Sequence, residues 1–404
     1  MKEIKMDIIK KAYCRTFQTV FKIALPFLPY RKPEMLDGTD DVPVLFKKKG
    51  IKRVLMVTDR GIRELGITKH LEKALAAERI KCIVYDKTVP NPTTDNVEEA
   101  RQLYLKEKCQ AVIGFGGGSS MDCAKAVGAR IAKPGQSLEK MKGILKIHKR
   151  LPMLIAIPTT AGTGSETTLA AVITDSKTRH KYPINDFSLI PRYAVLDPEV
   201  TKSLPRWVAA TTGMDALTHA VEAYIGRSTT KETRADASEA VRLIFKNIYE
   251  VCDNPDNTEA RRNMLHAAYL AGSAFTKSYV GYVHAVAHSL GGRYNVPHGL
   301  ANAVLLPHVL EGYGTSVYKK LHELAMAIGI SNANEGHRAG AEKFIKAVKE
   351  MKLRLDIPDR IREIRKKDIS RLARYADKEA NPLYPVPKLM DAKELERFYY
   401  DVME

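Results

Sequence analysis

The sequence predicts an α/β domain with a parallel sheet, followed by an all-helical domain. From about residue 40 to 200, short apolar runs alternate with helical patterns, which is typical of parallel strands joined by helices. Beyond Pro205, long helical periodicities follow one another with almost no strand-like run. We therefore expect an N-terminal domain over 1–203, with 1–40 as an extension, and a C-terminal helical domain over 204–404.

Predicted strands and helices alternate in the first half of the chain, and helices alone follow. Five apolar runs are expected to form strands, at 54–59, 82–86, 111–117, 151–159 and 194–198. Helical patterns lie between them at 64–78, 96–108 and 121–132. Pro205 suits the first turn of a helix, and further helical periodicities follow at 220–225, 236–252, 259–275, 301–313 and 341–355.

Composition narrows the class of protein. The chain has 404 residues, 45% of them apolar, and a formal net charge of +18. Its basic residues are spread along the chain and no nucleic-acid-binding motif stands out, so we expect no nucleic-acid partner. The five cysteines form no CxxC pair, which favours the reducing cytoplasm over a disulfide framework.

The first 36 residues are basic with apolar positions, and Lys22 and Pro26 interrupt their most apolar stretch. This pattern does not fit a signal peptide, and no uncharged apolar run in the chain is long enough to span a membrane. We expect the segment to pack on its own domain or on a neighbouring subunit. Binding to a membrane surface is the alternative.

Five side chains of types that can bind a metal lie in the second half of the chain, and four of them form pairs at helical spacing. Asp215 and His219 are four residues apart, as are His284 and His288, so each pair shares one face of a helix. His298 follows a turn containing glycine and proline that can fold it back. A carboxylate with several imidazoles favours a divalent transition metal.

Two loops after predicted strands suit a nucleotide. GFGGGSSMDCAK (114–125) carries three consecutive glycines before a helix, whose exposed amides can hold a pyrophosphate. Ser119 stands where the usual dinucleotide fingerprint has its third glycine, and a tight turn without a ligand is the alternative. PTTAGTGSETT (158–168) is rich in hydroxyl groups and small residues. Two such loops at the ends of parallel strands favour one shared ligand.

An acidic residue closes each of two predicted strands. A carboxylate at this place can accept hydrogen bonds from the adenosine ribose and repel a 2′-phosphate, which favours NAD over NADP. Asp59 and Asp86 are both candidates, and a plain turn aspartate is the alternative for either.

Four motifs together resemble the iron-dependent, or group III, alcohol dehydrogenases. These are GFGGGSSMDCAKA, PTTAGTGSE, GMDALTHAVEAY and HAVAHSLGGRYNVPHGLANAVLLPH, in that order. The resemblance runs from about Val54 to His308. It implies a Rossmann-like NAD-binding domain and a helical metal-binding domain, in a dehydroquinate synthase-like architecture.

The resemblance also assigns residues. It implies that the metal ligands are Asp215, His219, His284 and His298. It places His288 near the nicotinamide, where a proton-relay role is expected, with helix packing as the alternative. It favours Asp59 over Asp86 and implies these NAD contacts: Asp59, Gly117, Gly118, Ser119, Asp122, Thr159, Thr160, Ser165 and Lys181.

The function that follows is a metal-dependent alcohol dehydrogenase that interconverts a small alcohol and its aldehyde or ketone. Hydride passes between substrate and cofactor, with NAD(H) preferred over NADP(H), while Fe²⁺ polarises the substrate oxygen. Zinc accepts the same ligands. A cytoplasmic homodimer is expected. The alternatives are a glycerol-dehydrogenase-like or dehydroquinate-synthase-like member of the superfamily, and a non-catalytic nucleotide-binding protein.

Overall fold

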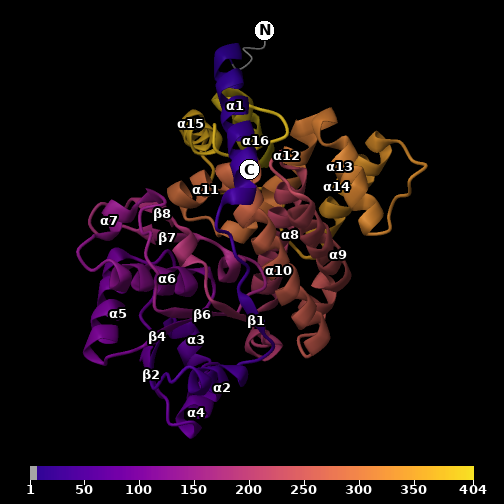
Figure 1. Cartoon of the computed structure of the whole chain (residues 1–404). Coiled ribbons are helices and arrows are strands. Elements are labelled where there is room, and N and C mark those ends of the chain that lie inside the picture. The colour runs from indigo at the N-terminus through magenta and orange to yellow at the C-terminus, as the bar shows by residue number, and fades with distance from the viewer. Residues whose placement is uncertain (1–6) are drawn as a thin grey trace. The chain divides into compact units, whose positions relative to one another are not determined.

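The computed structural model describes residues 7–404 (Figure 1). The described chain divides into two compact units. The sheet unit comprises residues 29–204 and 255–269, and the helical unit comprises 7–28, 205–254 and 270–404. We describe each unit by itself.

The sheet unit is built on six parallel strands in the order β1-β9-β6-β4-β2-β3. All five predicted strands are present, and the structure adds a short edge strand, β1. The central strand β4 is buried along its whole length, because helices cover both faces of a parallel sheet. The strands are β1 (Glu34–Leu36), β2 (Arg53–Val57), β3 (Lys81–Tyr85), β4 (Ala111–Gly116), β6 (Met153–Pro158) and β9 (Tyr193–Val195).

Helices pack on both faces of this sheet. One apolar cluster joins the sheet to α5 and α6, through residues such as Val97 and Ala124. The other cluster joins it to α2 and α4, through Phe46 and Leu71. The helices of this unit are α2 (Asp41–Lys48), α3 (Arg60–Glu64), α4 (Lys69–Ala77), α5 (Thr94–Lys106), α6 (Gly118–Ala132) and α7 (Leu138–Met141).

A second, three-stranded sheet was not predicted. It has the order β5-β8-β7 and consists of β5 (Gly143–Ile144), β8 (Lys181–Asn185) and β7 (Ala170–Thr174). Strands β7 and β8 are antiparallel. Strand β8 contains Pro183 and alternates buried with exposed residues, so it lacks a continuous apolar run, whereas the apolar run at 169–173 that includes most of β7 was overlooked in the sequence.

The helical unit confirms the all-helical prediction. Its core helix is α8, most of whose residues are buried, and α9 and α12 pack against it. Among the described residues of this unit, the only strand-like pairing is an isolated bridge between Ile361 and Met403. The helices are α1 (Ile8–Ala24), α8 (Arg206–Ile225), α9 (Lys231–Asp253), α11 (Tyr282–Tyr294), α12 (His298–Tyr313), α13 (Tyr318–Ala327), α14 (His337–Arg354), α15 (Ile369–Ala380) and α16 (Ala392–Val402).

No helix in the described part of the chain is long and apolar enough to cross a membrane. The remaining helix, α10 (Thr258–Ser278), begins in the sheet unit and continues into the helical unit.

Two segments lie in a different unit from the one expected. Residues 7–28 of the extension belong to the helical unit, because Gln18 donates to the Tyr384 carbonyl at 2.8 Å and Lys10 pairs with Asp377. Residues 1–6 of that extension lie outside the described part. The segment 255–269 belongs to the sheet unit, where the buried Arg261 donates to the Thr201 carbonyl at 2.7 Å.

Candidate metal and nucleotide sites

Four side chains of the helical unit bring their donor atoms together. One donor atom from each of the four lies within 4.8 Å of the other three. The set combines one carboxylate with three imidazoles, which is a donor set suited to a divalent transition metal. It consists of the four residues that the resemblance implies, namely Asp215, His219, His284 and His298.

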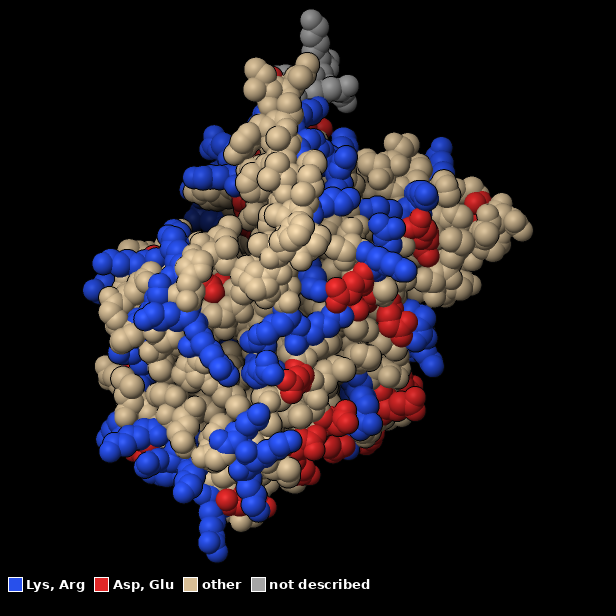
Figure 2. Space-filling model, viewed as in Figure 1, with Lys and Arg blue, Asp and Glu red and all other residues tan. Residues whose placement is uncertain are grey.

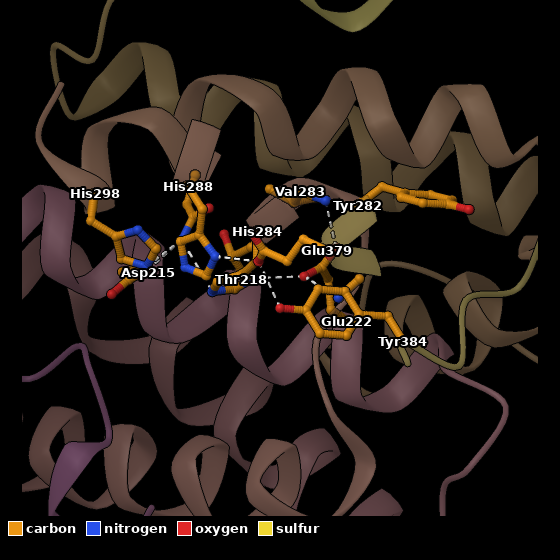
Figure 3. A network of polar contacts seen from close by, with 12 residues as sticks. Asp215, Thr218, Glu222, Tyr282, Val283, His284, His288, His298, Glu379 and Tyr384 are labelled. Carbon is orange, nitrogen blue, oxygen red and sulfur yellow. Dashed lines mark hydrogen bonds and ion pairs between the residues drawn. The ribbon is translucent and has the colours of Figure 1, made fainter. Parts of the chain in front are cut away.

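Local structure explains how these four residues meet. Asp215 and His219 are one turn apart on α8, as their spacing predicts. Helix α11, which carries His284, ends at Asn295 in the left-handed conformation, with φ of 57°. The chain then reverses, and His298 begins α12 beside the same site, with its Nε2 atom 3.4 Å from Asp215 Oδ1 (Figure 3).

His284 is oriented by a buried glutamate. Its Nδ1 atom lies 2.6 Å from Glu222 Oε2, so Nδ1 donates and Nε2 keeps its lone pair for the site. The same carboxylate accepts the backbone N–H groups of Gly281 and Val283, each at 2.8 Å. Burial lowers the pKa of His284 well below its usual value and raises that of Glu222 to about 7. The imidazole is therefore neutral, as a metal ligand must be.

Gly281 is needed for this arrangement. A Cβ atom at that position would lie 2.6 Å from Glu222 Oε1 and 3.3 Å from the Tyr313 hydroxyl. The closeness of this backbone to Glu222 therefore excludes a side chain.

A buried amide lies among the donor atoms. The Nδ2 atom of Asn302 is 2.7 Å from Asp215 Oδ1, 3.2 Å from His284 Nε2 and 3.1 Å from His298 Nε2. Its Oδ1 atom is buried and has no hydrogen-bond partner among the described residues. Asn302 therefore contacts three of the four candidate ligands.

His288 lies beside this set without belonging to it. Its ring stacks on that of His298, with centroids 5.2 Å apart, and its side chain is 43% exposed (Figure 3). His288 Nδ1 is 2.6 Å from Glu379 Oε1, which also accepts the Tyr384 hydroxyl at 2.8 Å. Burial acts to raise the pKa of Glu379, but His288, the Tyr384 hydroxyl and the charge of His298 together outweigh it and lower that pKa.

In the sheet unit, three neighbouring strands end at the predicted nucleotide residues. Asp59, Gly117 and Thr159 follow β2, β4 and β6, which lie side by side in the sheet. Gly117 is the N-cap of α6, and Gly118 is its first residue. A Cβ at Gly118 would lie 3.1 Å from the Thr163 side chain, so the two loops pack closely.

The positions of the two aspartates differ. Asp59 caps the N-terminus of α3 by accepting the Ile62 N–H at 3.0 Å, and it accepts the Ser120 hydroxyl at 3.2 Å. It thus lies against the start of α6, where a pyrophosphate is expected. Asp86 follows β3, the strand at the edge of the sheet.

The second loop carries an unsatisfied hydroxyl group. Thr159 donates its N–H to the Gly116 carbonyl at 3.0 Å, which joins the loop to the end of β4. Thr160 Oγ1 is buried and has no partner among the described residues, and a Cβ at Gly117 would lie 3.9 Å from it. A buried hydroxyl beside an open glycine turn fits a polar ligand at this place.

Asp122 and Ser165 bind each other. The Ser165 hydroxyl donates to Asp122 at 2.8 Å, and the buried Lys125 ammonium group donates to Ser165 at 3.0 Å and to Thr168 Oγ1 at 2.8 Å. Burial lowers the pKa of Lys125 to about 8. These bonds fix the second loop to α6, so the two residues hold the loops in place. Their direct contact with NAD stays a prediction.

Lys181 and Ser119 are joined through a third residue. Lys181 donates to the Asn91 side chain at 2.5 Å, and the Asn91 N–H donates to Ser119 Oγ at 3.3 Å. Of the nine predicted cofactor residues, eight lie at the main sheet's strand ends, on α6 or on strand β8, and Ser165 lies in the second loop.

Comparison with known proteins agrees with this geometry. The family model "Iron-containing alcohol dehydrogenase" matches residues 37–198, and "Fe-containing alcohol dehydrogenase family, C-terminal" matches 209–403. The chain belongs to the iron-containing alcohol dehydrogenase family. It is a metal-dependent alcohol dehydrogenase, and both of its units carry the family's sequence.

Individual relatives of this dehydrogenase use different alcohols, to judge by their names. It is 40% identical over 348 residues to alcohol dehydrogenase 4 of Schizosaccharomyces pombe, covering 84% of this chain and 81% of that one. It is 35% identical over 338 residues to an NAD-dependent methanol dehydrogenase of Bacillus methanolicus, covering 83% and 88%. A crystal structure of 1,3-propanediol oxidoreductase has a TM-score of 0.88 and 34% identity, covering 92% and 99%.

Three residues around the candidate metal site were missed from the sequence. Glu222 and Glu379 are separated from their histidines by 62 and 91 residues, so no local spacing reveals them. Asn302 follows His298 by four residues, and the same helical spacing that revealed the other pairs would have indicated it.

Proposed function

We propose that this dehydrogenase interconverts a small alcohol and its aldehyde or ketone, with Fe²⁺ in the helical unit and NAD(H) on the sheet unit. The observation that carries the proposal is the convergence of one carboxylate and three imidazoles within 4.8 Å. Fe²⁺ would be held there by Asp215, His219, His284 and His298.

A divalent ion in this site would supply Lewis-acid polarisation of the substrate oxygen. The protein's part is to keep the His284 imidazole neutral and the donors correctly oriented. Glu222 holds the lone pair of His284 Nε2 toward the site, and Asn302 holds Asp215 in place. Because Asp215 would be the only ionised ligand, a divalent ion held by these residues would leave the site with a charge of about +1, which would suit its role as a Lewis acid.

His288 is proposed as the residue that receives the alcohol proton. Its contact with Glu379 keeps the hydrogen on Nδ1 and leaves Nε2 with a lone pair. Its partial exposure gives the proton a route to solvent. The role rests on the position of His288 beside the ligand set.

We predict that His288→Gln keeps its metal and loses activity. A general base typically contributes about 10²–10⁴-fold in rate, so kcat should fall within this range. Metal content and kcat are measured on the same preparation. If the variant loses its metal, His288 is a ligand. If kcat is unchanged, His288 serves only in helix packing.

A preference for NAD(H) over NADP(H) is proposed from Asp59. Its carboxylate ends the strand next to the glycine turn, where an adenosine ribose is expected, and it would repel a 2′-phosphate. The Bacillus methanolicus relative is named as NAD-dependent, in agreement with this proposal.

We predict that Asp59→Gly raises kcat/KM for NADP(H) by roughly 10–100-fold, since a repulsive charge is removed. Glycine is the right replacement because it is tolerated as an N-cap, which limits the loss of stability. Asp86→Gly is the matched control and should leave the cofactor ratio unchanged. A wild-type enzyme that uses both cofactors equally would contradict the proposal.

The choice of iron is tested by reconstitution. We predict that apoprotein refilled under nitrogen reduces NAD with short alcohols best when Fe²⁺ is added, compared with Zn²⁺, Co²⁺ and Ni²⁺. Activity should decay in air as the iron is oxidised. The rise in NADH absorbance over a panel of alcohols shows which metal supports activity and which alcohols are substrates. Highest activity with zinc would overturn the iron assignment, and no activity with any metal would overturn the function.

We further propose that the enzyme works as a cytoplasmic homodimer on small-molecule substrates, without nucleic acid. Support for the compartment comes from its five cysteines, all of which are free thiols in the structure.

A further inference from the structure

Helix α1 presents an apolar stripe that none of the described residues covers. It lies outside both regions matched by the family, 37–198 and 209–403. Its exposed side carries large apolar residues at helical spacing, continued by Phe27 just beyond its end. Their exposed fractions are Ile8 82%, Ile9 77%, Tyr13 60%, Phe17 38%, Val20 61%, Ile23 65% and Phe27 85%.

The opposite side of α1 holds it to its own unit. Cys14 and Gln18 are buried there, and the Gln18 amide donates to the carbonyls of Pro382 and Tyr384. Arg15 donates to the Val386 carbonyl at 2.8 Å. The helix is thus held by the side that carries Cys14 and Gln18, while its stripe of large apolar residues faces outward, unlike a helix that only contributes to a core.

The charges carried by α1 itself have a single sign. Residues 8–24 include four basic residues and no acidic one, and Lys10 pairs with Asp377 of α15. Near the end of the helix, Lys22, Arg227 and Arg234 all lie close enough to Lys320 for their charges to interact, and Glu323 opposes them there. In Figure 2 the helix is a tan ridge with blue Lys and Arg atoms on both sides. The whole chain carries a net charge of +18.

We propose that the stripe on α1 binds the surface of an anionic lipid bilayer, lying in the interface without crossing it. An apolar helix face with basic flanks and no acidic residue is the pattern of interfacial helices. The bilayer is favoured over a second copy docked through the same stripe because residues 8–24 carry four basic residues and no acidic one, so anionic headgroups attract this helix whereas a second α1 repels it. The exposed aromatic rings of Tyr13 and Phe27 suit the headgroup region.

The test is co-sedimentation of the full-length enzyme with vesicles. Wild type should pellet with phosphatidylcholine–phosphatidylglycerol vesicles at low salt, and much less with phosphatidylcholine alone or at high salt. The variant Tyr13→Ser/Val20→Ser/Ile23→Ser should bind these vesicles more weakly than wild type, by a factor of about ten or greater, because apolar burial in the bilayer is lost. Its dehydrogenase activity in solution should be unchanged.

A matched control removes equally exposed apolar residues elsewhere. Val44→Ser/Leu65→Ser/Leu353→Ser replaces side chains that are 64%, 62% and 74% exposed, and it should bind vesicles like wild type. The proposal is overturned if wild type does not pellet with anionic vesicles, or if both triple variants bind equally. It is also overturned if light scattering without lipid shows that the α1 variant alone halves the particle mass, since the stripe would then join two copies.

Discussion

His284→Ala should abolish turnover while leaving the protein folded. His284 supplies one of four converging donors. Removing a direct ligand should reduce metal affinity by more than the roughly 10–100-fold that is typical when a residue that only orients a ligand is changed. We expect the affinity for the metal to fall by more than ~100-fold, and kcat to fall as the metal is lost. Metal per chain and kcat are measured together, and circular dichroism reports the fold.

His337→Ala is the control for this experiment. His337 begins α14 in the same unit, and its ring contacts His322 outside the ligand set. This variant should keep wild-type metal and rate. Full metal occupancy with unchanged kcat in His284→Ala would show that the four-residue site is not the metal centre.

Replacing Glu222 should weaken both the fold and the metal site, to different extents in two variants. Glu222→Leu leaves two backbone N–H groups and His284 Nδ1 buried without an acceptor, at about 1–3 kcal/mol each. We expect a loss of roughly 3 kcal/mol or more in the free energy of unfolding. Chemical denaturation of the metal-free protein measures it.

Glu222→Gln separates the two effects. The glutamine keeps one acceptor oxygen, so the loss of stability should be smaller than for leucine. Its amide N–H₂ group no longer fixes the hydrogen on His284 Nδ1, and metal affinity should still fall about 10–100-fold. Equal metal affinity in wild type and Glu222→Gln would show that this carboxylate does not orient the ligand.

Much of this architecture follows from local sequence. The apolar runs at 54–59 and 111–117 are buried strands because a strand covered on both faces has no polar side to show. The pair Asp215 and His219 shares a helix face because four residues make about one turn. The order of motifs also sufficed to identify the family, which the matches over 37–198 and 209–403 confirm.

Other features depend on contacts between distant segments. Strands β1 and β5 are too short to show a pattern, and pairing with neighbouring strands makes them strands. Helix α1 joined the helical unit through hydrogen bonds to residues more than 360 positions away.

The metal site shows the same division. Sequence spacing indicated that Asp215 and His219, and likewise His284 and His288, could act together as ligands, because side chains on one helix face are neighbours wherever that helix lies. Packing decided how they are oriented, since Glu222 reaches His284, and Glu379 reaches His288, only after their helices meet. A buried hydrogen-bond donor pairs with an acceptor that the fold brings within reach, and local sequence spacing does not reveal which acceptor this is.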